Sequence, residues 1–242
     1  MPQPTSDASL FDIVYTCRAM RRLKPDPVPK QTLLDLVDAA LQAPSGSNAQ
    51  NWRFVIVTDP EQKQKVEDIG KVTWDFYLDT FARADQRPGE DLDARRRMLK
   101  AGTYMVTHMH EAPAIVFVGV KQDQAVANVL RSPSTLAAFL THFGPLGMAR
   151  VLASTPRITA LADGSTAYPA VQNLLLAARA LGLGAVLTTP QFFVPGQFEA
   201  LLDLPSDFTL AAVIPVGYPM GKFGKVKRPG AEEVVSWERY EG

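Results

Sequence analysis

The chain has 242 residues, of which 46% are hydrophobic and 21% charged, as in an ordinary globular protein. Its 25 basic residues balance its 25 acidic residues, so no overall field favours nucleic acid or an anionic membrane as a partner. A single cysteine, Cys17, excludes an intrachain disulfide and a thiolate zinc cluster. No apolar run approaches the roughly 20 residues that span a bilayer, and the first residues show no signal peptide. These observations favour a soluble cytoplasmic protein.

The first quarter of the chain is predicted to hold two helices and a strand. Residues 1–8 are expected to form a flexible arm, after which Ser9 suits the cap of a short helix. Three prolines in residues 25–29 require an extended backbone. Apolar residues at helical spacing then predict a helix from Pro29 to Leu41, and the apolar run Phe54–Val57 predicts a buried strand.

The middle of the chain is predicted to be mainly helical around one strand. Residues 61–110 have helical character with a break at Pro88 and Gly89, and a strand is expected in the apolar run at 112–120. Residues 121–165 predict helices near 124–131 and 134–142, followed by a stretch interrupted by glycine and proline.

The clearest helix lies in "AYPAVQNLLLAARALGLG", residues 167–184. It is apolar nearly all round, which is typical of a helix in the centre of a large domain or in a subunit interface. Strands are expected in "AVLTT" and "FTLAAVIPVGYP", with a short helix between them in "FVPGQFEALLDL". Residues 220–242 are too polar for a core and are expected to wrap over a neighbour. Strands separated by helices predict an α+β or α/β domain around a central sheet.

Several kinds of chemistry are absent from the sequence. The "GLG" at 182–184 follows a helix and precedes a strand, the reverse of the order in a dinucleotide-binding fold. His108 and His110 would point to different faces of a helix, so no metal site is expected. Cys17 stands beside apolar residues and is expected to be packed rather than nucleophilic. No catalytic side chain can be named from the sequence.

Three polar clusters remain, and they are far apart in the sequence. Each alone also fits a solvated charge run or a turn. Together they suit an anionic ligand that carries a polar chain and a flat ring. The planar guanidinium of arginine matches the geometry of phosphate, and the side chains of Ser, Asn and Gln both donate and accept hydrogen bonds. The clusters are Arg18, Arg21 and Arg22; Ser45 to Gln50; and Lys225, Lys227 and Arg228.

Four ordered segments of the chain resemble the FMN-dependent nitroreductase family. They are "CRAMRRLKPDPVP", "APSGSNAQNW", "VQNLLLAARALGLGAVLTT", and "PVGYP" with "KRPGAEEVV". The resemblance covers roughly residues 14–59, 98–120 and 166–236. It implies an α+β nitroreductase-like fold over a single domain of residues 1–242, in which helices flank a central, mostly antiparallel sheet. A long central helix would form the interface of a homodimer.

The resemblance also implies a cofactor site at that interface. FMN would be held between two chains, with the tail 220–242 wrapping the partner subunit and residues 121–165 covering the substrate. Thr188 and Thr189 would supply backbone donors to the flavin ring. The other residues implied in cofactor binding are Arg18, Arg22, Ser45, Ser47, Asn48, Gln50, Lys227 and Arg228.

The function implied is an FMN-dependent NAD(P)H oxidoreductase. NADH or NADPH would reduce the flavin and leave, and a small nitroaromatic or quinone acceptor would then enter the same cleft, a ping-pong mechanism. The alternatives are another flavin chemistry on the same fold (reductive dehalogenation, flavin fragmentation or ring oxidation), a non-catalytic flavin-binding protein, or a scaffold without a cofactor.

This chain departs from the family pattern at four positions. Cys17 and Ala19 stand where many relatives have Arg and Ser, and Asn51 replaces a proline. Pro190 stands near a common glycine and cannot donate a backbone hydrogen bond. The donors at Thr188 and Thr189 are therefore located only to within one residue.

Overall fold

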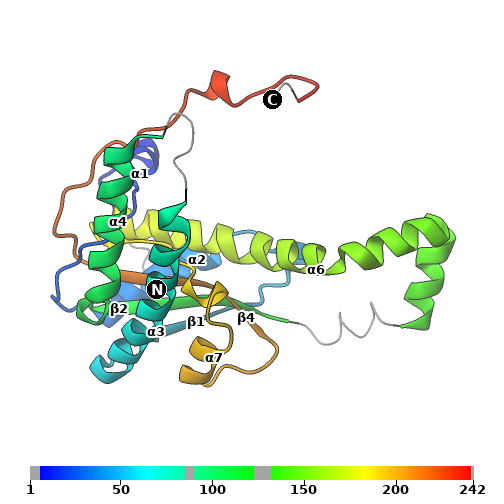
Figure 1. Ribbon diagram of the computed structural model, residues 1–242, viewed down its shortest axis with the longest axis horizontal. Coiled ribbons are helices and arrows are strands. Elements are labelled where there is room, and N and C mark those ends of the chain that lie inside the picture. The colour runs from blue at the N-terminus through cyan, green and yellow to red at the C-terminus, as the bar shows by residue number, and fades with distance from the viewer. Residues whose placement is uncertain (1–5, 85–89, 123–131, 241–242) are drawn as a thin grey trace.

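The computed structural model describes residues 6–84, 90–122 and 132–240. Its centre is a four-stranded sheet in the order β1-β2-β4-β3, and all three pairings are antiparallel. The strands are β1 (Trp52–Val57), β2 (Ala114–Lys121), β3 (Gly184–Ala185) and β4 (Phe208–Gly217). Helices flank this sheet (Figure 1), so the predicted α+β fold with a mostly antiparallel sheet is confirmed.

The helices pack on both faces of the sheet. They are α1 (Leu10–Thr16), α2 (Lys30–Leu41), α3 (Pro60–Asp79), α4 (Leu92–Thr107), α6 (Pro133–Ala180) and α7 (Gln197–Leu201). Side chains alternate along β2, so Val116 and Val118 face α2 and α6, whereas Ile115 and Phe117 face the cluster that includes residues of α3, α4 and α7. The strand is therefore buried on both sides and reads as a continuous apolar run.

Most predicted elements are confirmed with small changes of boundary. Ser9 caps α1 by accepting a hydrogen bond from the backbone of Asp12. Helix α2 begins at Lys30, directly after Pro29. The predicted central helix ends where Gly182 takes a positive φ of 74°. The expected break at 88–89, the expected helix at 124–131 and most of the expected arm at 1–8 lie outside the described residues.

The prediction for residues beyond 142 was wrong, because the chain is helical as far as Ala180. The predicted helix at 134–142 is the first of two helical segments in α6. They meet at Gly144, where the backbone leaves helical geometry (φ 66°, ψ 177°) and the chain changes direction. Pro145 stands in the first turn of the helical segment that follows Gly144. The backbone N–H of a first-turn residue makes no intrahelical hydrogen bond, so a proline there does not interrupt the next turns.

The first part of α6 projects beyond the sheet (Figure 1) and carries many exposed apolar side chains. They are Leu136, Leu140, Phe143, Leu146, Leu152, Ile158 and Leu161. Pro133–Thr155 is long and apolar enough to cross a membrane by length and composition, with none of its apolar window buried. This segment was not expected from the sequence, because scattered polar residues interrupt the apolar run. An exposed apolar surface of this size marks a site of interaction with another protein or with a membrane.

The predicted strand in "AVLTT" is much shorter than expected. Only Gly184 and Ala185 pair with β4, and the chain then leaves the ladder before Thr188 forms a single bridge to Val213. The turn at Pro190–Phe192 follows directly. In this register Val186 stands opposite Pro215, which has no N–H to donate, so the ladder is interrupted there. This segment borders the cavity described below.

A buried carboxylate ties α3 to the turn at Met109–Glu111. The Glu67 side chain is 2% exposed and accepts hydrogen bonds from the backbone N–H of His110 (3.0 Å) and from Lys71 Nζ (2.6 Å). Its second contact with His110 is through the ring Nδ1. Burial alone would raise the pKa of Glu67, but the hydrogen bonds from Lys71 and His110 outweigh burial and lower the pKa to about 2.

We expect Glu67→Gln to lower the free energy of unfolding at pH 7 by about 2–3 kcal/mol, since it leaves buried donors without a charged acceptor. A carboxyl whose pKa falls from 4.5 to about 2 on folding stabilises fully above pH 4.5 and loses that effect as the pH falls toward 2. Urea unfolding should therefore separate the variant from the parent at pH 7 but hardly at pH 2. The exposed neighbour Asp68 provides the control Asp68→Asn, with an expected change within about 0.5 kcal/mol. An equal gap at both pH values would contradict this assignment.

Candidate functional site

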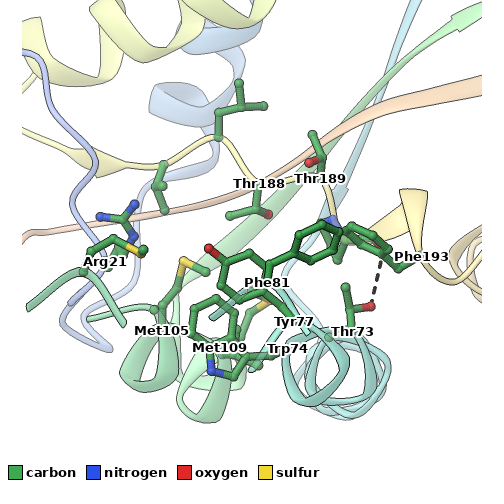
Figure 2. Close-up of a pocket in the computed structure, with 17 residues that line it drawn as sticks. Arg21, Thr73, Trp74, Tyr77, Phe81, Met105, Met109, Thr188, Thr189 and Phe193 are labelled. Carbon is green, nitrogen blue, oxygen red and sulfur yellow. Dashed lines mark hydrogen bonds between the residues drawn. The ribbon is translucent and has the colours of Figure 1, made fainter. Parts of the chain in front are cut away.

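A cavity of about 360 Å³ lies between α3, α4 and the segment that follows β3 (Figure 2). Arg21 lies at one end and Phe193 at the other, with Thr188 and Thr189 between them. Aromatic side chains of α3 form the opposite wall. The cavity thus has a long apolar surface and a few polar groups, the usual pattern of a ligand site.

Backbone hydrogen bonds fix the segment with the two threonines. Thr188 and Val213 exchange backbone hydrogen bonds of 3.0 and 2.9 Å, and the Thr188 hydroxyl donates to the Val213 carbonyl at 2.6 Å. From the opposite wall, the Thr73 hydroxyl donates to the Pro190 carbonyl at 3.4 Å (Figure 2). The two predicted threonines therefore stand on a rigid edge of the sheet and border the cavity.

Arg21 is the one charged side chain among the described residues that line this cavity. Burial lowers the pKa of its guanidinium, and the positive charge of nearby Arg18 lowers it further. No hydrogen bond or ion pair holds Arg21 within the part of the chain that the structure describes. Two close arginines without a carboxylate between them favour an anionic ligand.

Arg22, by contrast, does not line the cavity. Its guanidinium lies over the ring of Tyr104, 4.7 Å from the centroid, and the Tyr104 ring stacks on His108 with centroids 4.0 Å apart. The His108 Nδ1 is hydrogen-bonded to the Tyr104 carbonyl at 2.9 Å. The family resemblance named Arg22 and not Arg21 for the cofactor, although both stand in one basic cluster, because a sequence does not show which of two adjacent arginines turns inward.

The polar loop at Ser45 to Gln50 lies away from the cavity. Its anchor is α6, where Gly46 donates to the Thr166 hydroxyl at 3.4 Å. Helix α6 covers the other face of the sheet. Three of the loop's residues have positive φ, namely Ser47 (52°), Asn48 (52°) and Gln50 (49°), and their side chains are exposed. One chain therefore does not bring the four predicted loop residues to Arg21.

The predicted basic residues of the tail are also exposed. Lys227 and Arg228 lie in an extended segment that runs from the end of β4 along the outside of the molecule (Figure 1). The pKa of Asp91, the N-cap of α4, is lowered mainly by the hydrogen bonds that its carboxylate accepts from the backbone N–H groups of Ala94 and Asp93. Lys227 lies near enough to contribute to this lowering. Within one chain these residues do not line the cavity.

Besides Phe193, three aromatic residues of α3 and the turn after it line the cavity and were missed from the sequence: Trp74, Tyr77 and Phe81. They follow one another at spacings of three and four, so they lie on one side of α3 and its continuation. That spacing was the available signal, but the polar residues between them made the segment look like a surface helix. Among the described residues no group of His, Cys, Asp or Glu could hold a metal ion.

Comparison with known proteins identifies the family. The chain belongs to the nitroreductase family, because the model of that family matches residues 15–218. An NADH dehydrogenase of Thermus thermophilus is 28% identical over 232 residues, covering 91% of each chain. An iodotyrosine deiodinase of Thermotoga neapolitana is also 28% identical over 232 residues, covering 96% of this chain and 98% of its own length.

A solved structure supports the fold and the expected cofactor of the family. The chain matches a crystal structure of oxidised iodotyrosine deiodinase bound to FMN and 3-iodo-L-tyrosine, with a TM-score of 0.66 and 26% identity. The match covers 96% of this chain and 100% of that one. The predicted family and fold are thereby confirmed.

Proposed function

We propose that the protein is an FMN-dependent NAD(P)H oxidoreductase that reduces nitroaromatic or quinone acceptors. The observation that carries this proposal is the cavity in which a half-buried, unpaired Arg21 and two threonines face a wall of aromatic rings. Membership of the nitroreductase family and the FMN in a solved relative support the same cofactor. When bound, FMN supplies a redox centre that couples oxidation of NAD(P)H to reduction of a second substrate.

The residues of the cavity fit such a group. The apolar wall suits a flat ring, and the positive charge of Arg21, with the exposed Arg18 nearby, suits a phosphate or the electron-rich edge of a heterocycle. The segment at Thr188 and Thr189 would orient the ring through hydrogen bonds. We propose that Arg22 supports this end of the site through its stack on Tyr104.

The remaining predicted residues would require a second copy of the chain. The exposed apolar part of α6 lacks any cover among the described residues, and we propose that it packs on a second copy rather than on lipid. The loop with Ser45, Ser47, Asn48 and Gln50 would then complete the cavity of the partner. We propose that Lys227 and Arg228 in the tail add positive charge to the same site.

Two other functions compete with the proposed one, and they predict different behaviour of the bound flavin. Reductive dehalogenation is a second candidate, because an iodotyrosine deiodinase is as similar to the chain as the NADH dehydrogenase is. A passive flavin-binding protein would retain FMN without oxidising NAD(P)H. Enzymatic assays separate all three.

We expect the purified protein to be yellow and to bind one FMN per chain. NADH or NADPH should bleach the flavin under anaerobic conditions, and a quinone or a nitroaromatic compound should restore its absorbance. Stopped-flow absorbance measures both half-reactions. Restoration by 3-iodo-L-tyrosine with release of iodide, but not by quinones, would instead support dehalogenation. A protein that retains FMN but is not bleached would be a passive binder.

We expect Arg21→Ala to raise the Kd for FMN by about tenfold or more, because a charge-assisted hydrogen bond is lost from a half-buried site. Arg96→Ala on α4 is the control and should change the Kd by less than about threefold, since it removes an exposed arginine that pairs with Asp93 and does not line the cavity. Fluorescence titration of the apoprotein with FMN gives both constants. Equal effects of the two substitutions would contradict a role of Arg21 in holding FMN.

We expect the wild-type protein to have twice the 26.4 kDa mass of one chain in solution. The double variant Ile158→Asp/Leu161→Asp should have the mass of one chain, because charges cannot be buried unpaired in an apolar interface. Lys65→Asp on α3 is the control, since Lys65 is exposed on the opposite face of the sheet from α6. Light scattering coupled to gel filtration measures the mass. A double variant that keeps the wild-type mass would show that this surface is not the interface.

A further inference from the structure

We propose that Arg95 of α4 is a positioning residue for the cavity, because it holds the turn at Phe81–Arg83 where the Phe81 ring meets Phe193 at one end of that cavity. Arg95 does not itself line the cavity, so it acts on a ligand only through this turn. The inference rests on the proposed function, which puts FMN in the cavity, and it gives Arg95 control over how fast the cofactor leaves.

Three consecutive arginines stand near the start of α4, and the structure separates them by burial. The side chain of Arg95 is 17% exposed, whereas those of Arg96 and Arg97 are 75% and 71% exposed. Arg96 pairs with Asp93 at 3.0 Å and Arg97 with Asp91 at 3.8 Å, and exposed pairs of this kind contribute little to stability. Arg95 has lost most of its hydration, so it requires acceptors within the protein.

Arg95 finds these acceptors in the backbone of the turn. Its Nη2 donates to the carbonyl oxygens of Ala82 at 2.8 Å and Ala84 at 3.1 Å, and the Phe81 carbonyl lies at a longer 3.4 Å. Its Nη1 pairs with Glu90 Oε2 at 3.0 Å. The planar guanidinium presents these donors as a rigid fork, so one side chain fixes the turn relative to α4.

The other polar contacts that the structure describes for this turn lie within it or at the end of α3. The Arg83 N–H donates to the Thr80 carbonyl at 3.1 Å, and the Thr80 hydroxyl donates to the Phe76 carbonyl at 2.6 Å. The ion pair of Arg83 with Asp79 joins side chains that are 74% and 65% exposed. Among the described residues, every hydrogen bond between the turn and α4 comes from Arg95. Loss of its guanidinium would therefore release the turn from α4 and leave α3 intact.

Phe81 connects this turn to the cavity. Its ring contacts the ring of Phe193, with centroids 5.9 Å apart and planes at 55°, and both rings line the cavity (Figure 2). Phe193 follows the segment with the two threonines, so this contact joins the α3 side of the cavity to the threonine side. A contact with Phe76, at 6.3 Å and 78°, supports the Phe81 ring from α3. A released turn would part Phe81 from Phe193 and open this end of the cavity to water.

The rate at which FMN leaves the loaded protein tests this role. We expect Arg95→Met, which keeps the aliphatic stem but lacks the guanidinium, to raise the dissociation rate constant of FMN about fivefold. Arg95→Lys can keep the ion pair with Glu90 but has no planar fork, so its rate constant should lie between those of the parent and Arg95→Met. Arg96→Met is the matched control and should leave the rate constant unchanged. Fluorescence of the FMN released after rapid dilution gives all four values.

A double-mutant cycle separates positioning from a general loss of stability. Phe81→Ala should also raise the dissociation rate constant. Adding Arg95→Met to Phe81→Ala should then change it by less than about 1.5-fold, because the ring through which Arg95 acts is already absent. In the apoprotein, hydrogen exchange of residues 80–84 should be faster in Arg95→Met than in Arg96→Met, which reports release of the turn without any ligand.

The opposite results overturn the proposal. They are unchanged release of FMN from Arg95→Met, unchanged exchange of the turn, or an equal further increase when Arg95→Met is added to Phe81→Ala. If Arg95→Met does not fold, the same cycle with Arg95→Lys decides. A parent protein that binds no FMN would refute the proposed function and this role with it, whereas a parent that holds FMN regardless of Arg95 would refute this role alone.

Discussion

Strand β2 has no face toward solvent, so every side chain along its buried length must find an apolar partner on one side of the sheet or the other. On one side the partners come from α2 and α6, and on the other from α3, α4 and α7. Removing either layer would expose a continuous apolar strip, which at about 25 cal/mol per Å² is a large part of the stability of a domain. The two layers are therefore required together.

The cavity lies where the edge of the sheet meets one of these layers. Beyond Ala185 the ladder is interrupted, and residues of α3, α4 and the segment up to Pro190 line the space between them. The close approach of Gly102 to Trp74 fixes the distance between the two helices, and aromatic side chains border the space that remains. The same packing that stabilises the core thus defines the volume available to a ligand.

Local patterns in the sequence predicted the elements that form this core. Helix α2 and strands β2 and β4 were correct because apolar spacing reports burial directly. The extent of α6 was not predicted, since glycine and proline normally end helices, and only the geometry at Gly144 shows how the chain continues. Which arginine enters the cavity depends on the tertiary direction of the backbone at Met20 to Leu23, which no local pattern contains.

The loop at Ser45 to Gln50 illustrates a conflict between folding and chemistry. Ser47, Asn48 and Gln50 hold left-handed backbone angles that cost on the order of 1 kcal/mol each, and glycine would adopt them freely. Glycine would remove this strain but would also give the unfolded chain more conformational freedom, so the two effects nearly cancel. Laboratory evolution for heat resistance would therefore leave these three positions largely untouched, and substitutions that accumulate there would record selection on ligand recognition.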